Sequence, residues 1–230
     1  MSRQLKYILL DCDGVILNSE LLSRDAELEV LADFGLTLSA RQYDEITLGL
    51  SETWHLKLIS KELDKIGVGI SLDHLETKLR DARWSRYETG LRIVPGMDTV
   101  IDQYKCRLAV VSSSDRRSVR RKLKLAGASG VPPERIFTGD QTTNSKTETY
   151  ELALTKLEAS SNECLAIEDS RPGVLAARSA NIEVWGFTGT STQAAALEGE
   201  LFASGASKAF NSVAALHRAV DQAFTRGLAA

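Results

Sequence analysis

The sequence predicts an α/β protein with a doubly wound parallel sheet, like a Rossmann core, and an inserted α-helical domain. Short apolar runs recur along the chain, each followed by small or acidic residues and then by a helical pattern. One long stretch, residues 18–91, contains helical periodicity and no such run. Helices cover both faces of a parallel sheet, so its strands are apolar throughout.

The strands are expected at the apolar runs, and the helices follow them. The five expected strands are residues 7–10, 108–111, 135–137, 164–167 and 182–185. Helical patterns follow three of these strands, at residues 116–126, 147–157 and 173–180. This alternation of strand and helix is the pattern of a doubly wound sheet.

The interval between the first two strands is expected to form a helical cap domain. Leucines and tryptophans at helical spacing mark three helices there, around Leu28, Leu58 and Leu79, separated by glycines. We therefore expect a core domain at residues 1–17 and 92–230, and a cap domain at residues 18–91.

The composition excludes several classes of partner. The chain has 230 residues, with 28 Lys and Arg against 31 Asp and Glu, a net charge of −3. A mildly acidic chain has no general attraction to nucleic acid or to an anionic membrane, and no apolar stretch approaches the roughly 18 residues of a membrane span. We expect a cytoplasmic protein, monomeric or weakly dimeric, that binds neither nucleic acid nor membrane.

A basic run on the expected helix 116–126 is interpreted as a solvated helix face. It contains Arg116, Arg117, Arg120, Arg121, Lys122 and Lys124. The same helix has an ordinary apolar stripe, formed by Val119, Leu123 and Ala126, and no nucleic-acid-binding motif accompanies the run.

Polar residues stand at the expected carboxyl ends of several strands, where open parallel sheets bind ligands. They are Asp11, Asp13, Ser112, Glu168 and Asp169, with Lys146 just before an expected helix. Carboxylates that converge at one edge repel one another unless a cation lies among them. The available ligands are all oxygen atoms, which favours Mg²⁺ over Zn²⁺.

The same residues indicate a ligand that carries a phosphoryl group. Ser112 offers a hydroxyl and Lys146 a positive charge for an anion. Aspartate is able to form a covalent phosphoryl intermediate, and an aspartate two residues away can transfer the proton when its neighbours raise its pKa.

These motifs, in this order, resemble those of the haloacid dehalogenase superfamily. They are Asp11-Cys12-Asp13-Gly14-Val15, Ser112 after an apolar run, Lys146, and Ile167-Glu168-Asp169-Ser170 followed by Gly173. The helices inserted after the first motif resemble the cap of this superfamily. Within it, the chain is similar to sugar-phosphate phosphatases, including the 6-phosphogluconate phosphatase type, and to β-phosphoglucomutase.

The resemblance implies a role for each residue and Mg²⁺ as the cofactor. Asp11 would be the nucleophile, Asp13 the acid and base, and Lys146 the group that offsets charge on Asp11 and the phosphoryl group. Ser112, Ser113 and Lys146 would bind phosphate; Asp11, Asp13 (through its main-chain carbonyl), Glu168 and Asp169 would bind the metal. In the cap, Glu20, Ser51 and Arg83 would contact substrate. The implied reaction is hydrolysis of a small phosphorylated metabolite, a sugar phosphate or sugar-acid phosphate, through an aspartyl-phosphate.

Two alternatives stay open, a phosphosugar mutase and a non-catalytic module that binds a phosphorylated metabolite. Against the mutase, Ser23 and Glu52 stand where the mutases have a histidine and an arginine. Against the module, the whole catalytic set is present. The segment after Lys146 departs from the family's Lys-Pro-x-Pro-Asp, because residues 147–150 read Thr-Glu-Thr-Tyr.

Overall fold

The computed structural model describes residues 4–47, 52–128, 130–143 and 145–226, except the side chains of residues 52–54 and 226. The chain forms two compact units. The core unit consists of Met1–Asn18 and Arg92–Ala230, and the helical unit of Ser19–Leu91. Among the described residues, no helix is long and apolar enough to span a membrane.

The core unit is built on a parallel sheet of six strands, in the order β3-β2-β1-β4-β5-β6. The strands are β1 (Tyr7–Leu10), β2 (Leu108–Ser112), β3 (Ile136–Thr138), β4 (Cys164–Glu168), β5 (Glu183–Phe187) and β6 (Lys208–Phe210). Every residue of the central strands β2 and β4 is buried, as expected for strands with both faces covered. The predicted fold class is confirmed.

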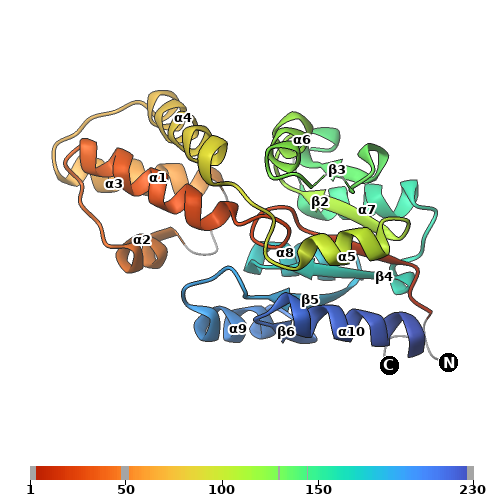
Figure 1. Cartoon of the computed structure of the whole chain (residues 1–230). Helices are drawn as coiled ribbons and strands as arrows, with labels where there is room; N and C mark the ends of the chain where they lie inside the picture. Colours follow the sequence, from red (N-terminus) through yellow and green to blue (C-terminus); the bar gives the residue numbers. More distant parts are fainter. Residues whose placement is uncertain (1–3, 48–51, 129, 144, 227–230) are drawn as a thin grey trace. The chain divides into compact units, whose positions relative to one another are not determined.

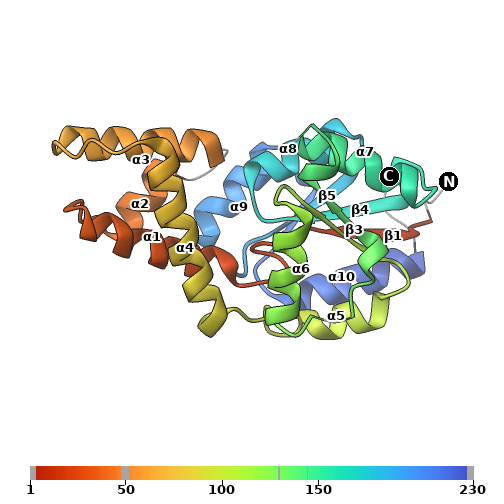
Figure 2. The ribbon, with the colours of Figure 1, turned by 90° about the horizontal axis from the view of Figure 1, so that it is seen from above.

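Helices cover both faces of the sheet (Figure 1). They are α5 (Met97–Tyr104), α6 (Arg116–Leu125), α7 (Lys146–Lys156), α8 (Arg171–Ser179), α9 (Ala194–Ala203) and α10 (Val213–Arg226). Figure 2 shows α7 and α8 on one face and α5 and α10 on the other. After β1 the chain crosses to β2 and β3 on one side of β1, and it later returns to β4 on the other side, so the strand order reverses beside β1. Such a reversal is where doubly wound sheets bind ligands.

Side-chain caps fix where three of these helices begin, close to the site. Asp115, Ser145 and Ser170 each accept a hydrogen bond from a backbone N–H in the first turn of α6, α7 and α8. Such caps satisfy amide groups that have no partner within the helix.

The described part of the helical unit forms four helices: α1 (Ser19–Asp33), α2 (Ala40–Thr47), α3 (Glu52–Lys65) and α4 (Leu72–Gly90). They enclose a small apolar core that includes Leu31, Ile59, Leu63, Leu75 and Leu79. One carboxylate of this unit, Glu27 on α1, is also buried.

Five of the described elements were not predicted from the sequence: α2, α5, α9, β6 and α10. The helix α2 is short and has one buried residue, Tyr43, so few apolar positions mark it in the sequence. The strand β6 has three residues and begins with an exposed lysine at the sheet edge. Short edge elements bury little side-chain surface, and the sequence therefore carries little signal for them.

Candidate active site

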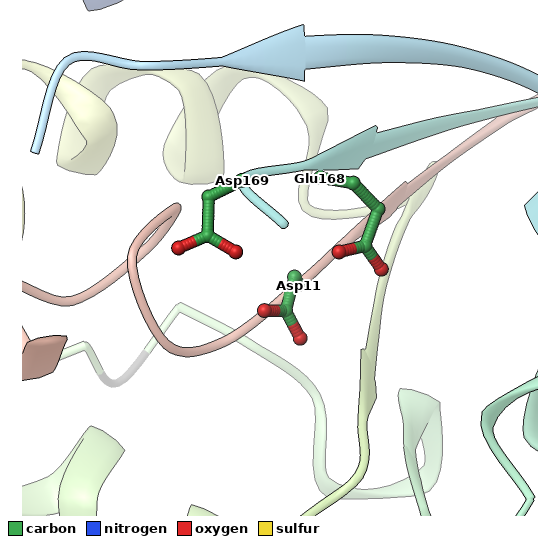
Figure 3. A group of neighbouring side chains, drawn as sticks. All are labelled: Asp11, Glu168 and Asp169. Carbon is green, nitrogen blue, oxygen red and sulfur yellow. The ribbon is translucent and has the colours of Figure 1, made fainter. Parts of the chain in front are cut away.

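The carboxyl ends of β1 and β4 bring three acidic side chains together. Asp11 follows the last residue of β1, Glu168 ends β4, and Asp169 comes next. One carboxylate oxygen from each lies within 4.8 Å of the others, and Figure 3 shows the three carboxyl groups turned toward a shared space. The strands β1 and β4 pair directly, with Leu10 opposite Ile167, so the topology places these acids side by side.

Burial makes this group of carboxylates costly to charge. Asp11 is 6% exposed and Glu168 is fully buried. Desolvation raises the pKa of Asp11, although the neighbouring Lys146 opposes the shift. It also raises the pKa of Glu168 to about 7, again against the effect of Lys146. The site therefore favours a positive partner for these acids.

Lys146 bridges two of the acids. Its Nζ lies 2.9 Å from Oδ1 of Asp11 and 2.8 Å from Oε1 of Glu168. It is the first residue of α7, directly after the cap residue Ser145. Burial alone would lower the pKa of Lys146, but Asp11 and Glu168 outweigh burial and raise it. Although residues 147–150 lack the prolines of the family's pattern, Lys146 contacts Asp11.

Tyr150 supports Glu168 from α7 and was not recognised in the sequence. Its buried hydroxyl donates a 2.6 Å hydrogen bond to Oε1 of Glu168, from the position where the family's pattern has an aspartate. The other oxygen, Oε2, is buried and has no hydrogen-bond partner among the described residues. An unpaired buried carboxylate oxygen is unfavourable without a cation or another donor.

Two glycines make room for the acids. A Cβ on Gly14 would lie 1.7 Å from Oδ2 of Asp169, and the φ of Gly14 is +76°. A Cβ on Gly173 would lie 1.8 Å from Oε2 of Glu168. Any larger residue would displace these carboxylates, which explains the glycines in both motifs.

We expect Gly173→Ala to destabilise the protein by about 1–3 kcal/mol, because the added methyl group overpacks the site against Glu168. The free energy of unfolding, measured in urea, tests this. The matched control is Gly199→Ala in α9, where a Cβ meets nothing within 4 Å; it should be neutral or stabilising by up to about 1 kcal/mol. Equal effects of the two substitutions would contradict the expected clash.

Lys122 corrects the interpretation of the basic run as a solvated face. It is 5% exposed, and its ammonium donates to Oδ2 of Asp13. The sequence did contain a signal, because Lys122 lies between Val119 and Leu123 on the buried face of α6. Four other members of the run, Arg117, Arg120, Arg121 and Lys124, are exposed.

The two serines predicted to bind phosphate differ in their surroundings. Ser112 ends β2, is 2% exposed, and its Oγ accepts a hydrogen bond from the amide of Ser114. Ser113 is exposed. A phosphate-binding role stays a prediction for both.

The predicted substrate contacts of the cap fall in the helical unit. Glu20 is exposed, and Ser51 lies outside the described residues. The guanidinium of Arg83 is 3.5 Å from the buried carboxylate of Glu27, which also accepts from Tyr43 at 2.5 Å and lies 3.1 Å from His55. Thus Arg83 has a structural partner within its own unit.

The charges of the core site fit a divalent cation. The four carboxylates of Asp11, Asp13, Glu168 and Asp169 stand against the two ammonium groups of Lys122 and Lys146. When all are ionised, two negative charges remain among these side chains. The all-oxygen donor set and the unpaired Oε2 of Glu168 point to the same kind of ion.

Comparison with known proteins identifies the family of this chain. Residues 8–187 match the family of haloacid dehalogenase-like hydrolases. The chain therefore belongs to that family, and the predicted resemblance is confirmed.

The chain is similar to curated proteins and solved structures of different kinds. It is 30% identical to the protein SUPPRESSOR OF QUENCHING 1, chloroplastic, of Arabidopsis thaliana, over 76% of this chain but only 17% of that protein. It is 26% identical to the phosphorylated carbohydrates phosphatase of Thermotoga maritima, over 78% of this chain and 83% of that protein. A haloacid dehalogenase-like protein from Agrobacterium tumefaciens has the same fold, with a TM-score of 0.82, 22% identity, and coverage of 94% of this chain and 98% of that one.

Proposed function

We propose that this protein is a Mg²⁺-dependent phosphatase that hydrolyses a small phosphorylated metabolite through an aspartyl-phosphate. The observation that carries the proposal is the bridge from Lys146 to Asp11 and Glu168, with Asp13 two residues after Asp11. The T. maritima phosphatase of phosphorylated carbohydrates, similar over most of both chains, supports a sugar phosphate or sugar-acid phosphate as substrate.

In the first step, a carboxylate oxygen of Asp11 forms a bond to phosphorus, and the bond from phosphorus to the leaving oxygen breaks. The carboxyl group of Asp13 gives its proton to that oxygen, so that the alcohol leaves neutral. Lys146 keeps Asp11 oriented and offsets negative charge around the phosphoryl group.

In the second step, water attacks phosphorus, and the bond from phosphorus to Asp11 breaks. Asp13 takes a proton from this water and is ready for the next cycle. Inorganic phosphate leaves, and Asp13 again carries the proton that it gave up in the first step.

Asp11, Glu168 and Asp169 would hold the metal, with the main-chain carbonyl of Asp13. When bound there, Mg²⁺ would neutralise charge on the phosphoryl group during transfer and would favour the ionised form of Glu168, whose pKa burial raises.

A serine in the helical unit favours hydrolysis over mutase activity. Ser23 stands where the mutases have a histidine, and its Oγ is 2.5 Å from the hydroxyl of Tyr87. A hydroxyl held in this way has no acid–base function near neutral pH.

The test is phosphate release by the purified chain with Mg²⁺, across sugar phosphates, phosphoglycolate and nucleotides. For a ¹³C-labelled hexose 1-phosphate, NMR should detect free hexose and phosphate as products. Formation of the 6-phosphate in preference to free sugar would replace the proposal by the mutase. Calorimetric binding without any turnover would replace it by the binding module.

A further inference from the structure

We propose that Lys122 is a positioning residue that fixes the carboxyl group of Asp13 for proton transfer. The proposal rests on the phosphatase function proposed above and adds a residue to its machinery. Its basis is the contact between the Lys122 ammonium and Oδ2 of Asp13.

Lys122 is a charged residue in a largely buried position, which calls for an explanation. Its side chain is 6% exposed, and that of Asp13 is 19% exposed. A buried ammonium is unfavourable unless a hydrogen-bonded anion accompanies it. Val119 and Leu123 are its buried neighbours on α6, so an apolar residue would pack at this position without that cost. The role of the lysine is therefore its contact with Asp13 and not the packing of α6.

The contact assigns the two oxygens of Asp13 different tasks. A protonated carboxyl group still accepts at its other oxygen, so the ammonium can contact Oδ2 in both protonation states of Asp13. The proton that Asp13 transfers is then carried by Oδ1. A carboxyl group held at one oxygen cannot rotate freely, and water is largely excluded from the pair. Fixing the donor atom matters because a displacement of about 1 Å can reduce a catalysed rate about 100-fold.

Two other roles for Lys122 predict different kinetics. If Lys122 bound the phosphoryl group directly, its loss would raise KM for every phosphate ester. If the ion pair served only folding, its loss would lower the rates for all substrates equally. If Lys122 acts through Asp13, the loss in rate instead depends on how strongly the leaving group requires protonation.

The experiment compares an alkyl phosphate substrate with 2,4-dinitrophenyl phosphate, whose leaving group departs without protonation. Rapid mixing measures the first-turnover rate constant for both, because later turnovers also require Asp13 to activate water. The variants are Lys122→Met, which removes the charge, and Lys122→Arg, which retains it. Lys124→Met is the matched control, since Lys124 is exposed on the same helix.

We expect Lys122→Met to lower the first-turnover rate for the alkyl substrate by about 30- to 100-fold. The dinitrophenyl rate should change by less than about threefold, as should KM for both substrates, taken from the concentration dependence of the first-turnover rate. Lys122→Arg should recover at least part of the alkyl rate, and Lys124→Met should resemble the wild type. If Lys122→Met folds poorly, Lys122→Gln replaces it, and the ratio of the two rates is independent of the folded fraction.

Equal losses on both substrates, a general rise in KM, or no loss at all would overturn the role of Lys122 while leaving the phosphatase function intact. A wild-type chain that releases phosphate from neither substrate would instead overturn the phosphatase function, and this role with it.

Discussion

The substitution Asp11→Asn is expected to lower the rate of phosphate release by at least about 1,000-fold, because uncatalysed hydrolysis of phosphate monoesters is extremely slow. The amide has nearly the shape of the carboxylate, and its oxygen can still accept from Lys146. It cannot attack phosphorus, so no aspartyl-phosphate forms. Turnover with the best substrate and acid-quenched labelling with a ³²P substrate measure the two effects.

The control for this substitution is Asp98→Asn, which makes the same chemical change at an exposed position in the first turn of α5. Both variants should have the circular dichroism of the wild type. Mass spectrometry should verify that the introduced amide has not reverted to a carboxylate by deamidation during purification. Residual activity of Asp11→Asn above about a thousandth of the wild type would exclude Asp11 as the nucleophile.

Removal of the metal is expected to abolish phosphate release, and Mg²⁺ should restore it. The structural reason is the acidic group of Asp11, Glu168 and Asp169, with oxygens within 4.8 Å. Ligand binding to the folded state alone stabilises a protein by about 2.7 kcal/mol at 100 times Kd. Saturating Mg²⁺ should therefore raise the Tm of the chelated protein, a readout that needs no catalysis.

Asp169→Ala should remove most of this increase in Tm. In chelator the variant should be as stable as the wild type or more stable, because one negative charge leaves a crowded site. Asp98→Ala, at the exposed position on α5, should retain the full Mg²⁺ effect. An undiminished rise in Tm for Asp169→Ala, or wild-type activity in excess chelator, would contradict the metal site.

The fold class and the four acidic residues of the site could be predicted from the sequence, because both depend on local patterns. Continuous apolar runs marked β1, β2 and β4, and acidic or small residues followed them. Parallel pairing places Asp11, Glu168 and Asp169 at the same edge of the sheet. The direct pairing of β1 with β4, which the sequence did not predict, brings them side by side. Local sequence was also sufficient to locate Lys146, since it begins a helix beside that edge.

The contacts of Lys122 and Tyr150 could not be predicted from local sequence patterns. Lys122 is 109 residues from Asp13 in the sequence, and nothing in the basic run distinguishes it from its exposed neighbours except the face of α6 on which it lies. Tyr150 is equally ambiguous, because a buried tyrosine on an amphipathic helix usually belongs to the core.

The sequence by itself determined the parallel sheet, the helical insert and the acids at the strand ends, because apolar runs that alternate with helical patterns leave few alternatives for these. Only the tertiary structure decided which cation contacts which acid: Lys146 with Asp11 and Glu168, and Lys122 with Asp13. The physical reason is that a long side chain reaches several positions from one Cα, and the packing of its helix against the sheet selects the carboxylate that it contacts.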